Sequence, residues 1–106
     1  MFGWLRRTAD DLFGARSGRW PKVRRDHLAK NPACAACGKT DGDMEVHHIR
    51  PISRGGDELD PRNLITLCAD PCHLVHGHLM GWSRQNEEVV QDCTTYRSKV
   101  EKAKHD

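Results

Sequence analysis

The sequence predicts a small α+β domain in which two short strands and a short helix are closed by a metal site and flanked by helices. Two close cysteine pairs, Cys34/Cys37 and Cys68/Cys72, bracket a segment in which strand-like runs alternate with turn-forming residues. A chain of 106 residues is expected to form one domain. Because so short a chain buries only a limited part of its surface, a bound metal would help to stabilise it.

The N-terminal part of the chain is expected to be helical and basic. Apolar residues within 2–13 suggest a short amphipathic helix, and Pro21 suits the first turn of a second helix running to about Lys30. Residues 1–30 hold eight lysines and arginines against three aspartates, a net charge of +5, so the whole-chain charge of +2 leaves −3 for the remainder. Such a basic arm suits a phosphate backbone. A solvated helix face is an equally good alternative.

The middle of the chain alternates strands and loops. Residues 44–49 have the period-two pattern of a strand, which Pro51 ends, and residues 53–57 are turn formers. Residues 64–67 are predicted to form a second strand, and Pro71 opens a short helix that carries the last cysteine.

The C-terminal part is predicted to add one more helix, capped near Asn86 and continuing to about Lys102. Its apolar residues recur at helical spacing, which favours packing on the core, with a contact to a second subunit as the alternative. The resulting division is a basic helical arm over 1–32, a core over 33–82, and a C-terminal helix over 83–106 packed on that core.

The four paired cysteines are expected to bind one structural zinc ion, because pairs on either side of a hairpin can converge on one tetrahedral centre. Disulfides and four unligated buried thiols are the alternatives. Arg6 and Asp10 interrupt the first apolar residues, and no segment approaches the roughly 20 apolar residues of a membrane span. A soluble cytoplasmic protein is therefore expected, and a reducing compartment favours zinc over disulfides. Cys93 is interpreted as a small apolar side chain.

A dense motif lies inside the cysteine pairs. In order, the chain reads Glu45-Val46-His47-His48-x-x-Pro51-Ile52-Ser53-x-Gly55-Gly56, then Asn63-Leu64, then Cys72-His73. This pattern, over residues 34–80, resembles the HNH endonucleases, and the cysteine pairs resemble the zinc-bearing branch of that family. The Gly77-His78-Leu79 stretch with Trp82 is similar to small phage and bacterial members. The resemblance implies a ββα-metal core and a metal-dependent DNA endonuclease.

The resemblance also implies roles for single residues. His48 takes the position of the general base, His47 and His73 take positions of catalytic-metal ligands, and Asn63 takes that of the residue orienting the base. For a third ligand the helix offers His76 at i+3 and His78 at i+5 from His73, because Gly77 occupies i+4. The likeness of the surrounding stretch favours His78, with His76 as the alternative.

The substrate and the metal are less closely defined. By the resemblance, Glu45 takes an acidic position of colicin-type DNases and is a candidate for bracing an arginine or the metal shell, with a solvated strand carboxylate as the alternative. Imidazole ligands suit zinc, nickel or manganese and magnesium prefers oxygen, so Mg²⁺, Mn²⁺, Ni²⁺ and Zn²⁺ all stay open. Association with a phage terminase is implied by family analogy alone. The competing function is a noncatalytic zinc-containing module that binds nucleic acid. The expected DNA-binding residues are Arg19, Lys22, Arg24, Arg25, Arg50 and Arg54.

Overall fold

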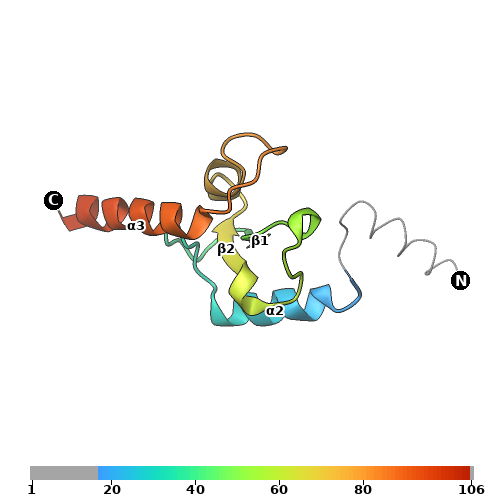
Figure 1. The fold of residues 1–106 in the computed structure, drawn as a ribbon. Coiled ribbons are helices and arrows are strands. Elements are labelled where there is room, and N and C mark those ends of the chain that lie inside the picture. The colour runs from blue at the N-terminus through green and yellow to red at the C-terminus, as the bar shows by residue number, and fades with distance from the viewer. Residues whose placement is uncertain (1–16, 106) are drawn as a thin grey trace, which may run out of the picture.

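The computed structural model describes residues 17–105, so the helix expected within residues 2–13 lies outside the described residues. The predicted α+β class is confirmed. The helix expected over 21–30 and the strands expected over 44–49 and 64–67 fall within one residue of their expected bounds. In chain order the elements are α2 (Trp20–Lys30), β1 (Met44–His48), η1 (Ile52–Arg54), η2 (Pro61–Asn63), β2 (Leu64–Cys68), η3 (His73–Gly77) and α3 (Val89–His105) (Figure 1).

An antiparallel hairpin of β1 and β2 forms the centre of the molecule. The register places His47 opposite Ile65 and His48 opposite Leu64. Residues directly opposite each other share a face of the sheet, and successive residues alternate between the faces. His47 and His48 therefore belong to opposite faces of the hairpin.

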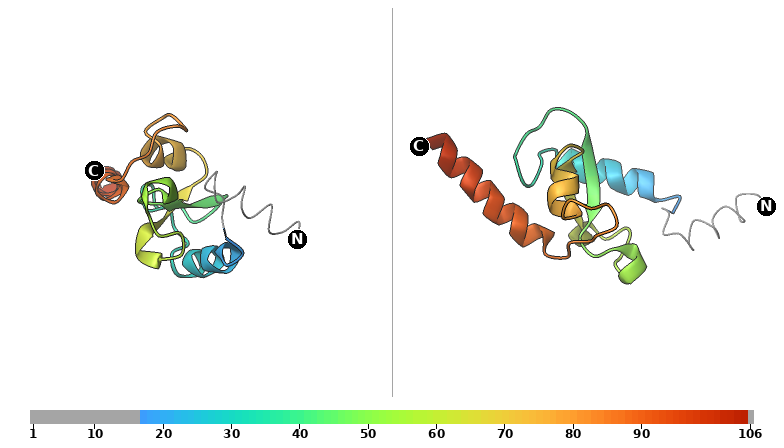
Figure 2. Two further views of the ribbon diagram at one scale, coloured as in Figure 1. Left: turned by 45° about the vertical axis from the view of Figure 1, so that its right-hand side comes forward. Right: turned by 90° about the horizontal axis from the view of Figure 1, so that it is seen from above.

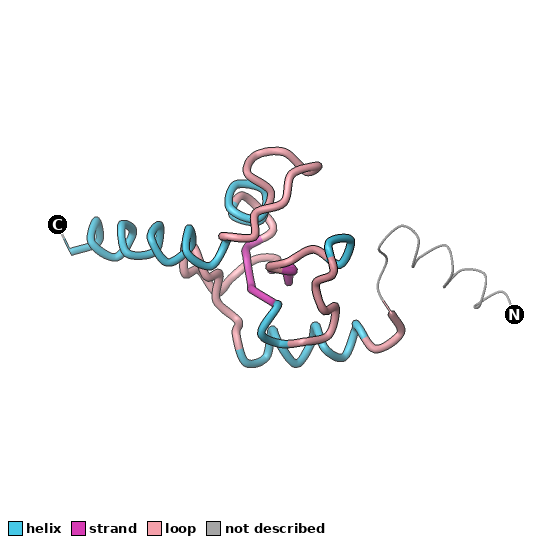
Figure 3. Tube along the Cα trace, in the orientation of Figure 1, coloured by secondary structure: helices cyan, strands magenta, loops and turns pink. Residues whose placement is uncertain are grey.

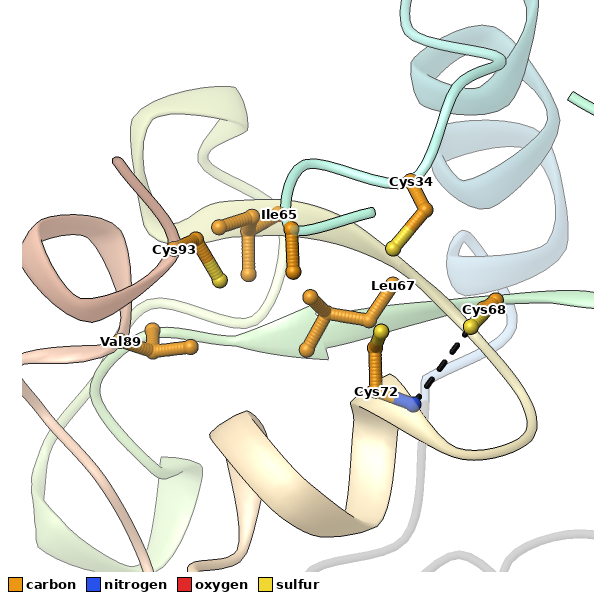
Figure 4. Packing of buried hydrophobic residues seen from close by; sticks show 8 residues of the cluster. Cys34, Ile65, Leu67, Cys68, Cys72, Val89 and Cys93 are labelled. Atoms are coloured by element: carbon orange, nitrogen blue, oxygen red, sulfur yellow. Dashed lines mark hydrogen bonds between the residues drawn. The ribbon is translucent and has the colours of Figure 1, made fainter. Parts of the chain in front are cut away.

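Different parts of the chain pack on the two faces of the hairpin. Helix α2 lies on one face, where Trp20 is buried with Val46 and Leu64. On the other face Ile65 and Leu67 pack against the four-cysteine region and the first turns of α3 (Figure 4). The two views in Figure 2 show α2 and η3 on opposite sides of the hairpin. Because other parts of the chain pack on both faces, all five residues of β2 are buried.

The segment after β2 departs from the expected short α-helix. The element η3 spans only His73–Gly77 and is a π-helix, in which hydrogen bonds run from residue i to i+5. A loop then leads to α3 (Figure 3). The Asp70–Pro71 peptide bond before η3 is cis, in the turn that joins the second cysteine pair.

Helix α3 begins at Val89, and the predicted cap at Asn86 is three residues earlier. The Asn86 side-chain oxygen accepts a hydrogen bond from the Glu88 backbone N–H at 3.0 Å. Val89 and Cys93 are buried in the core, whereas Tyr96 is 40% exposed. The rest of α3 extends away from the hairpin (Figure 1). None of the helices described in residues 17–105 is long and apolar enough to cross a membrane.

Candidate metal centres and active site

The four paired cysteines form the first cluster of the site. Their sulfur atoms all lie within 4.8 Å of one another, and the Cys37 and Cys68 sulfurs are 4.0 Å apart. All five cysteines are free thiols. The predicted four-cysteine cluster is thus confirmed, with Cys93 outside it in the core.

Backbone hydrogen bonds shape both cysteine pairs in the same way. The Cys37 N–H points to the Cys34 sulfur at 3.5 Å, and the Cys72 N–H points to the Cys68 sulfur at 3.4 Å (Figure 4). In the first pair the turn closes through Gly38, whose φ of 82° is a left-handed conformation that favours glycine. Each pair is therefore a small turn that presents two sulfurs to a common centre.

The electrostatics of the cluster suit a bound cation. Burial alone would raise the pKa of Cys34, but hydrogen bonds from the backbone of Cys37, Cys68 and Ala36 lower it to about 7. Burial, together with the neighbouring sulfurs, raises the pKa of Cys72 far above its usual range. Four adjacent thiolates repel one another unless a cation compensates their charge. A tetrahedral zinc site has sulfur edges of about 3.8 Å, given zinc–sulfur bonds of about 2.3 Å. The observed spacing fits such an ion.

Three histidines form the second cluster. His47 comes from β1 and His73 from η3, while His78 directly follows η3. One ring nitrogen from each lies within 4.8 Å of the other two. The His73 and His78 Nε2 atoms are 3.2 Å apart, against about 3.3 Å for two imidazoles on a tetrahedral ion with bonds of about 2.0–2.1 Å. These three residues fit a metal site.

The π-helical turn explains why His78, and not His76, joins the cluster. A wider turn brings a residue five positions later back towards the face of the first. His76 instead places its ring 4.8 Å from that of Tyr96 on α3. A β-carbon at Gly77 would lie 3.2 Å from ring atoms of His47 and 3.3 Å from His73. The absence of a side chain at Gly77 therefore leaves room for the two rings to converge.

Hydrogen bonding fixes the chemistry of the His78 ring. Its Nδ1 lies 2.8 Å from the Arg84 carbonyl oxygen, which can only accept, so the ring proton is on Nδ1. The Nε2 lone pair then faces the His73 ring. Burial, followed by the neighbouring His78, lowers the pKa of His73 despite an opposing effect of Glu45. A neutral imidazole is the form that binds a metal.

His48 lies on the other face of the strand. Its ring centroid is 4.8 Å from that of Trp20 on α2, with 34° between the planes. Its Nε2 lies 2.9 Å from the Glu58 carbonyl oxygen, which places the proton on Nε2 and the basic lone pair on Nδ1. β1 stays paired with β2 through His48, so the strand does not bend between His47 and His48.

A pocket joins the two faces at the end of the strand. It has a volume of about 290 Å³ and is lined by His48 as well as by the three clustered histidines. Glu45 and Gln85 also line it. Because the chain turns away at Pro51, the pocket reaches around the strand end and gives both histidine faces access to one space.

Asn63 connects the loop after β1 to the hairpin. Its side-chain oxygen accepts from the Arg50 N–H at 2.8 Å, and its amide nitrogen donates to the carbonyls of Arg50 at 3.1 Å and Asp57 at 2.8 Å. Asp57 immediately precedes Glu58, whose carbonyl receives His48. A β-carbon at Gly56 would overlap the Arg50 carbonyl. The loop is thus tightly closed. Asn63 is linked to the His48 ring indirectly, because it binds the backbone of Asp57 and His48 binds the backbone of the next residue, Glu58.

The expected DNA-binding residues fall into two groups. Arg50 and Arg54 flank the pocket-lining segment 51–53, and both approach Glu87, with nitrogen–oxygen distances of 3.7 and 3.3 Å. On α2 and just before it, Arg19 and Arg25 are exposed and Lys22 pairs with Asp26.

Arg24 lies differently from its neighbours on α2. Its guanidinium donates to the Met44 carbonyl at 3.0 Å and so ties the helix to β1. The exposed basic side chains among the expected residues on this side are therefore Arg19, Lys22 and Arg25.

Sequence reasoning assigned no role in the site to three residues beside the pocket. These are Trp20, which packs on His48, Glu87, which bridges two arginines, and Trp82, whose ring meets His73 and His78. The apolar run of residues 79–82 was a visible signal for Trp82, whereas neither Trp20 nor Glu87 has a local sequence signal that points to the site.

An antiparallel hairpin, a short helical element that follows it, a four-cysteine cluster and a histidine cluster together define a ββα-metal domain. Residues 34–79 match the family model described as HNH endonuclease, so this segment is an HNH endonuclease domain and the resemblance is confirmed. No curated protein and no solved structure matches the chain. A domain of this family implies a metal-dependent nuclease and a nucleic-acid substrate.

Proposed function

We propose that the chain is a DNA endonuclease that hydrolyses phosphodiester bonds with a divalent metal, nicking or cutting with low intrinsic sequence specificity. The supporting observation is that the nitrogens of three histidines gather at a pocket that a fourth histidine, His48, also lines. In the described residues, the matched domain is accompanied only by helices α2 and α3 and their connections. Residues 17–105 therefore contain no separate module for recognising a DNA sequence.

His48 is the proposed general base. The Glu58 carbonyl holds the proton on Nε2, so Nδ1 is the atom that removes a proton from the attacking water. The Trp20 ring packs on the imidazole and limits its rotation. Asn63 supports this arrangement from a distance, because it anchors the backbone next to Glu58.

His47, His73 and His78 are the proposed ligands of the catalytic ion. When bound, a divalent cation would offset negative charge on the scissile phosphate and on the departing 3′ oxygen. Three protein ligands leave positions for phosphate oxygen and water. The four-cysteine cluster is proposed to hold a structural zinc ion, which would fasten the loop before β1 to the start of η3.

Supercoiled plasmid provides the direct test of this function. With Mg²⁺, Mn²⁺, Ni²⁺ or Zn²⁺ added singly, at least one metal is expected to support conversion to open-circular and linear DNA. His47→Ala is expected to lose this activity in every metal, because one of the three ligands is gone. Absence of cleavage with all four metals would favour the noncatalytic binding module instead, and equal cleavage by His47→Ala would reject the histidine metal site.

Glu87 provides a test of the arginines beside the pocket. If Arg50 and Arg54 bind backbone phosphates, the Glu87 carboxylate competes for them in the free protein. Exposed ion pairs of this kind contribute about 0–1 kcal/mol, so Glu87→Gln is expected to tighten DNA binding by roughly two- to five-fold at low salt. Fluorescence anisotropy with a labelled duplex measures this change.

The matched control is Glu88→Gln, which removes the same charge from the adjacent exposed residue. A smaller gain is expected, since only the net charge changes. Equal gains for the two variants would show that overall charge, and not release of the two arginines, controls binding.

A further inference from the structure

The loop after the histidine cluster exposes large apolar side chains beside the pocket. Leu79, Met80 and Trp82 are 42%, 67% and 60% exposed. Elsewhere in the described residues, the exposed large apolar side chains are those of Val90 and Tyr96. Exposed apolar patches commonly mark interaction sites. We call residues 79–82 the apolar loop; it is the orange segment that projects between η3 and α3 in Figure 1.

The apolar loop is held in a defined conformation. Leu79 and Met80 have φ angles of 51° and 69°, which are uncommon for residues other than glycine. The Met80 N–H bonds to the Leu74 carbonyl at 2.9 Å, and the Gly81 N–H bonds to the His78 carbonyl at 3.0 Å. The Arg84 guanidinium donates to the Leu79 carbonyl at 3.3 Å. A backbone strained in this way and fixed by hydrogen bonds is typical of functional sites.

Trp82 links this loop to the proposed catalytic centre. Its ring centroid lies 5.3 Å from that of His73 and 5.1 Å from that of His78, with 65° and 57° between the planes. The contact with His73 is edge-on and the contact with His78 is tilted, so neither is a parallel stack. Much of the indole surface stays exposed. An exposed indole therefore lies directly beside two of the three proposed metal ligands.

We propose that the apolar loop binds an unstacked nucleobase next to the scissile phosphate, with Trp82 as the stacking surface. This inference rests on the proposed function, since the phosphate on the histidine cluster places the neighbouring base near Trp82. A continuous duplex turns its base faces inward, whereas single strands and gaps expose them. Aromatic side chains bind exposed bases through their faces, independently of sequence. We thus infer a preference for single-stranded DNA and for duplexes with unpaired nucleotides over continuous duplex DNA.

The test compares binding of three labelled DNAs of one sequence: a single strand, a duplex with a short gap, and a continuous duplex. Anisotropy is measured in buffer without added divalent ion, so that cleavage plays no part. Trp82→Ala is expected to weaken binding of the single strand and the gapped duplex by about five-fold or more, as for loss of one stacked base. Binding of the continuous duplex is expected to change by less than about two-fold, since it has no exposed base to stack.

Two substitutions at Trp82 separate stacking from apolar bulk. Trp82→Phe is expected to keep most of the affinity for single strands, and Trp82→Leu is expected to behave like Trp82→Ala. Tyr96→Ala is the control at another exposed aromatic, whose ring lies against His76 outside the cluster; no change is expected. Equal losses on all three DNAs, no loss on any, or full retention by Trp82→Leu would each overturn the inference. If the apolar loop instead binds a protein partner, Trp82→Ala would cause no loss of affinity for any of the three DNAs.

Two further measurements distinguish a failure of the base-stacking inference from a failure of the proposed endonuclease function. Ni²⁺ titration of Trp82→Ala is expected to match wild type, which excludes damage to His73 and His78 as the cause of weaker binding. Plasmid cleavage by wild-type protein tests the proposed function without reference to Trp82. A protein that cleaves plasmid while Trp82→Ala loses affinity equally for all three DNAs, or for none of them, retains the proposed function and loses only the base-stacking inference.

Discussion

His48→Ala is expected to lower the rate of plasmid nicking by about 10²–10⁴-fold, the usual contribution of a positioned general base. The physical reason is that this variant removes the proposed base and keeps the proposed metal ligands. DNA affinity and metal content are expected to stay at wild-type levels, because His48 is not among the three clustered histidines. Single-turnover nicking in a fixed concentration of the best metal measures the effect.

Two companion variants sharpen this test. His48→Gln can still donate a hydrogen bond to the Glu58 carbonyl but cannot accept a proton near neutral pH, so it is expected to be as inactive as His48→Ala. His76→Ala removes an imidazole that lies against Tyr96, outside the cluster, and is expected to nick at close to the wild-type rate. Substantial nicking by His48→Gln would show that His48 positions another group and is not itself the base.

Local patterns predicted much of the fold because each element carries its own signal. Alternation over 44–49 and a short apolar run over 64–67 indicated both strands, and Pro21 and Lys30 bounded the helix that became α2. The cysteine spacing predicted a cluster that the structure contains. In each case the determining interactions lie within a few residues or follow from one well-defined coordination geometry.

The site depends on features that local patterns do not show. On an α-helix, i+5 lies away from the face of residue i, so spacing alone left His76 and His78 unresolved. The π-helical turn of η3 and the absence of a side chain at Gly77 bring His78 to His47. Likewise, Trp20 contacts His48 only because α2 packs on the face of the hairpin that carries His48, opposite the histidine cluster. Such contacts between distant segments require the tertiary structure.

Cys37→Ser is expected to release the structural metal and abolish cooperative thermal unfolding. Structural zinc binding contributes about 10–16 kcal/mol in small domains, which equals or exceeds the total stability of a typical domain, about 5–15 kcal/mol. Losing one of four thiolates removes most of that contribution. Substitution with Co²⁺ reports on the site directly, since thiolate ligation produces charge-transfer absorption that imidazole ligation does not.

Cys93→Ala is the matched control for this effect. Cys93 is buried like most of the clustered cysteines but lies in the core outside the four-cysteine cluster. Its substitution is expected to preserve the thiolate absorption and to cost about 1 kcal/mol of stability, as for a small core deletion. His47→Ala is likewise expected to preserve this absorption, because it affects only the histidine cluster. A Cys37→Ser protein that keeps wild-type cobalt absorption and thermal unfolding would show that the four sulfurs do not hold a metal that stabilises the fold.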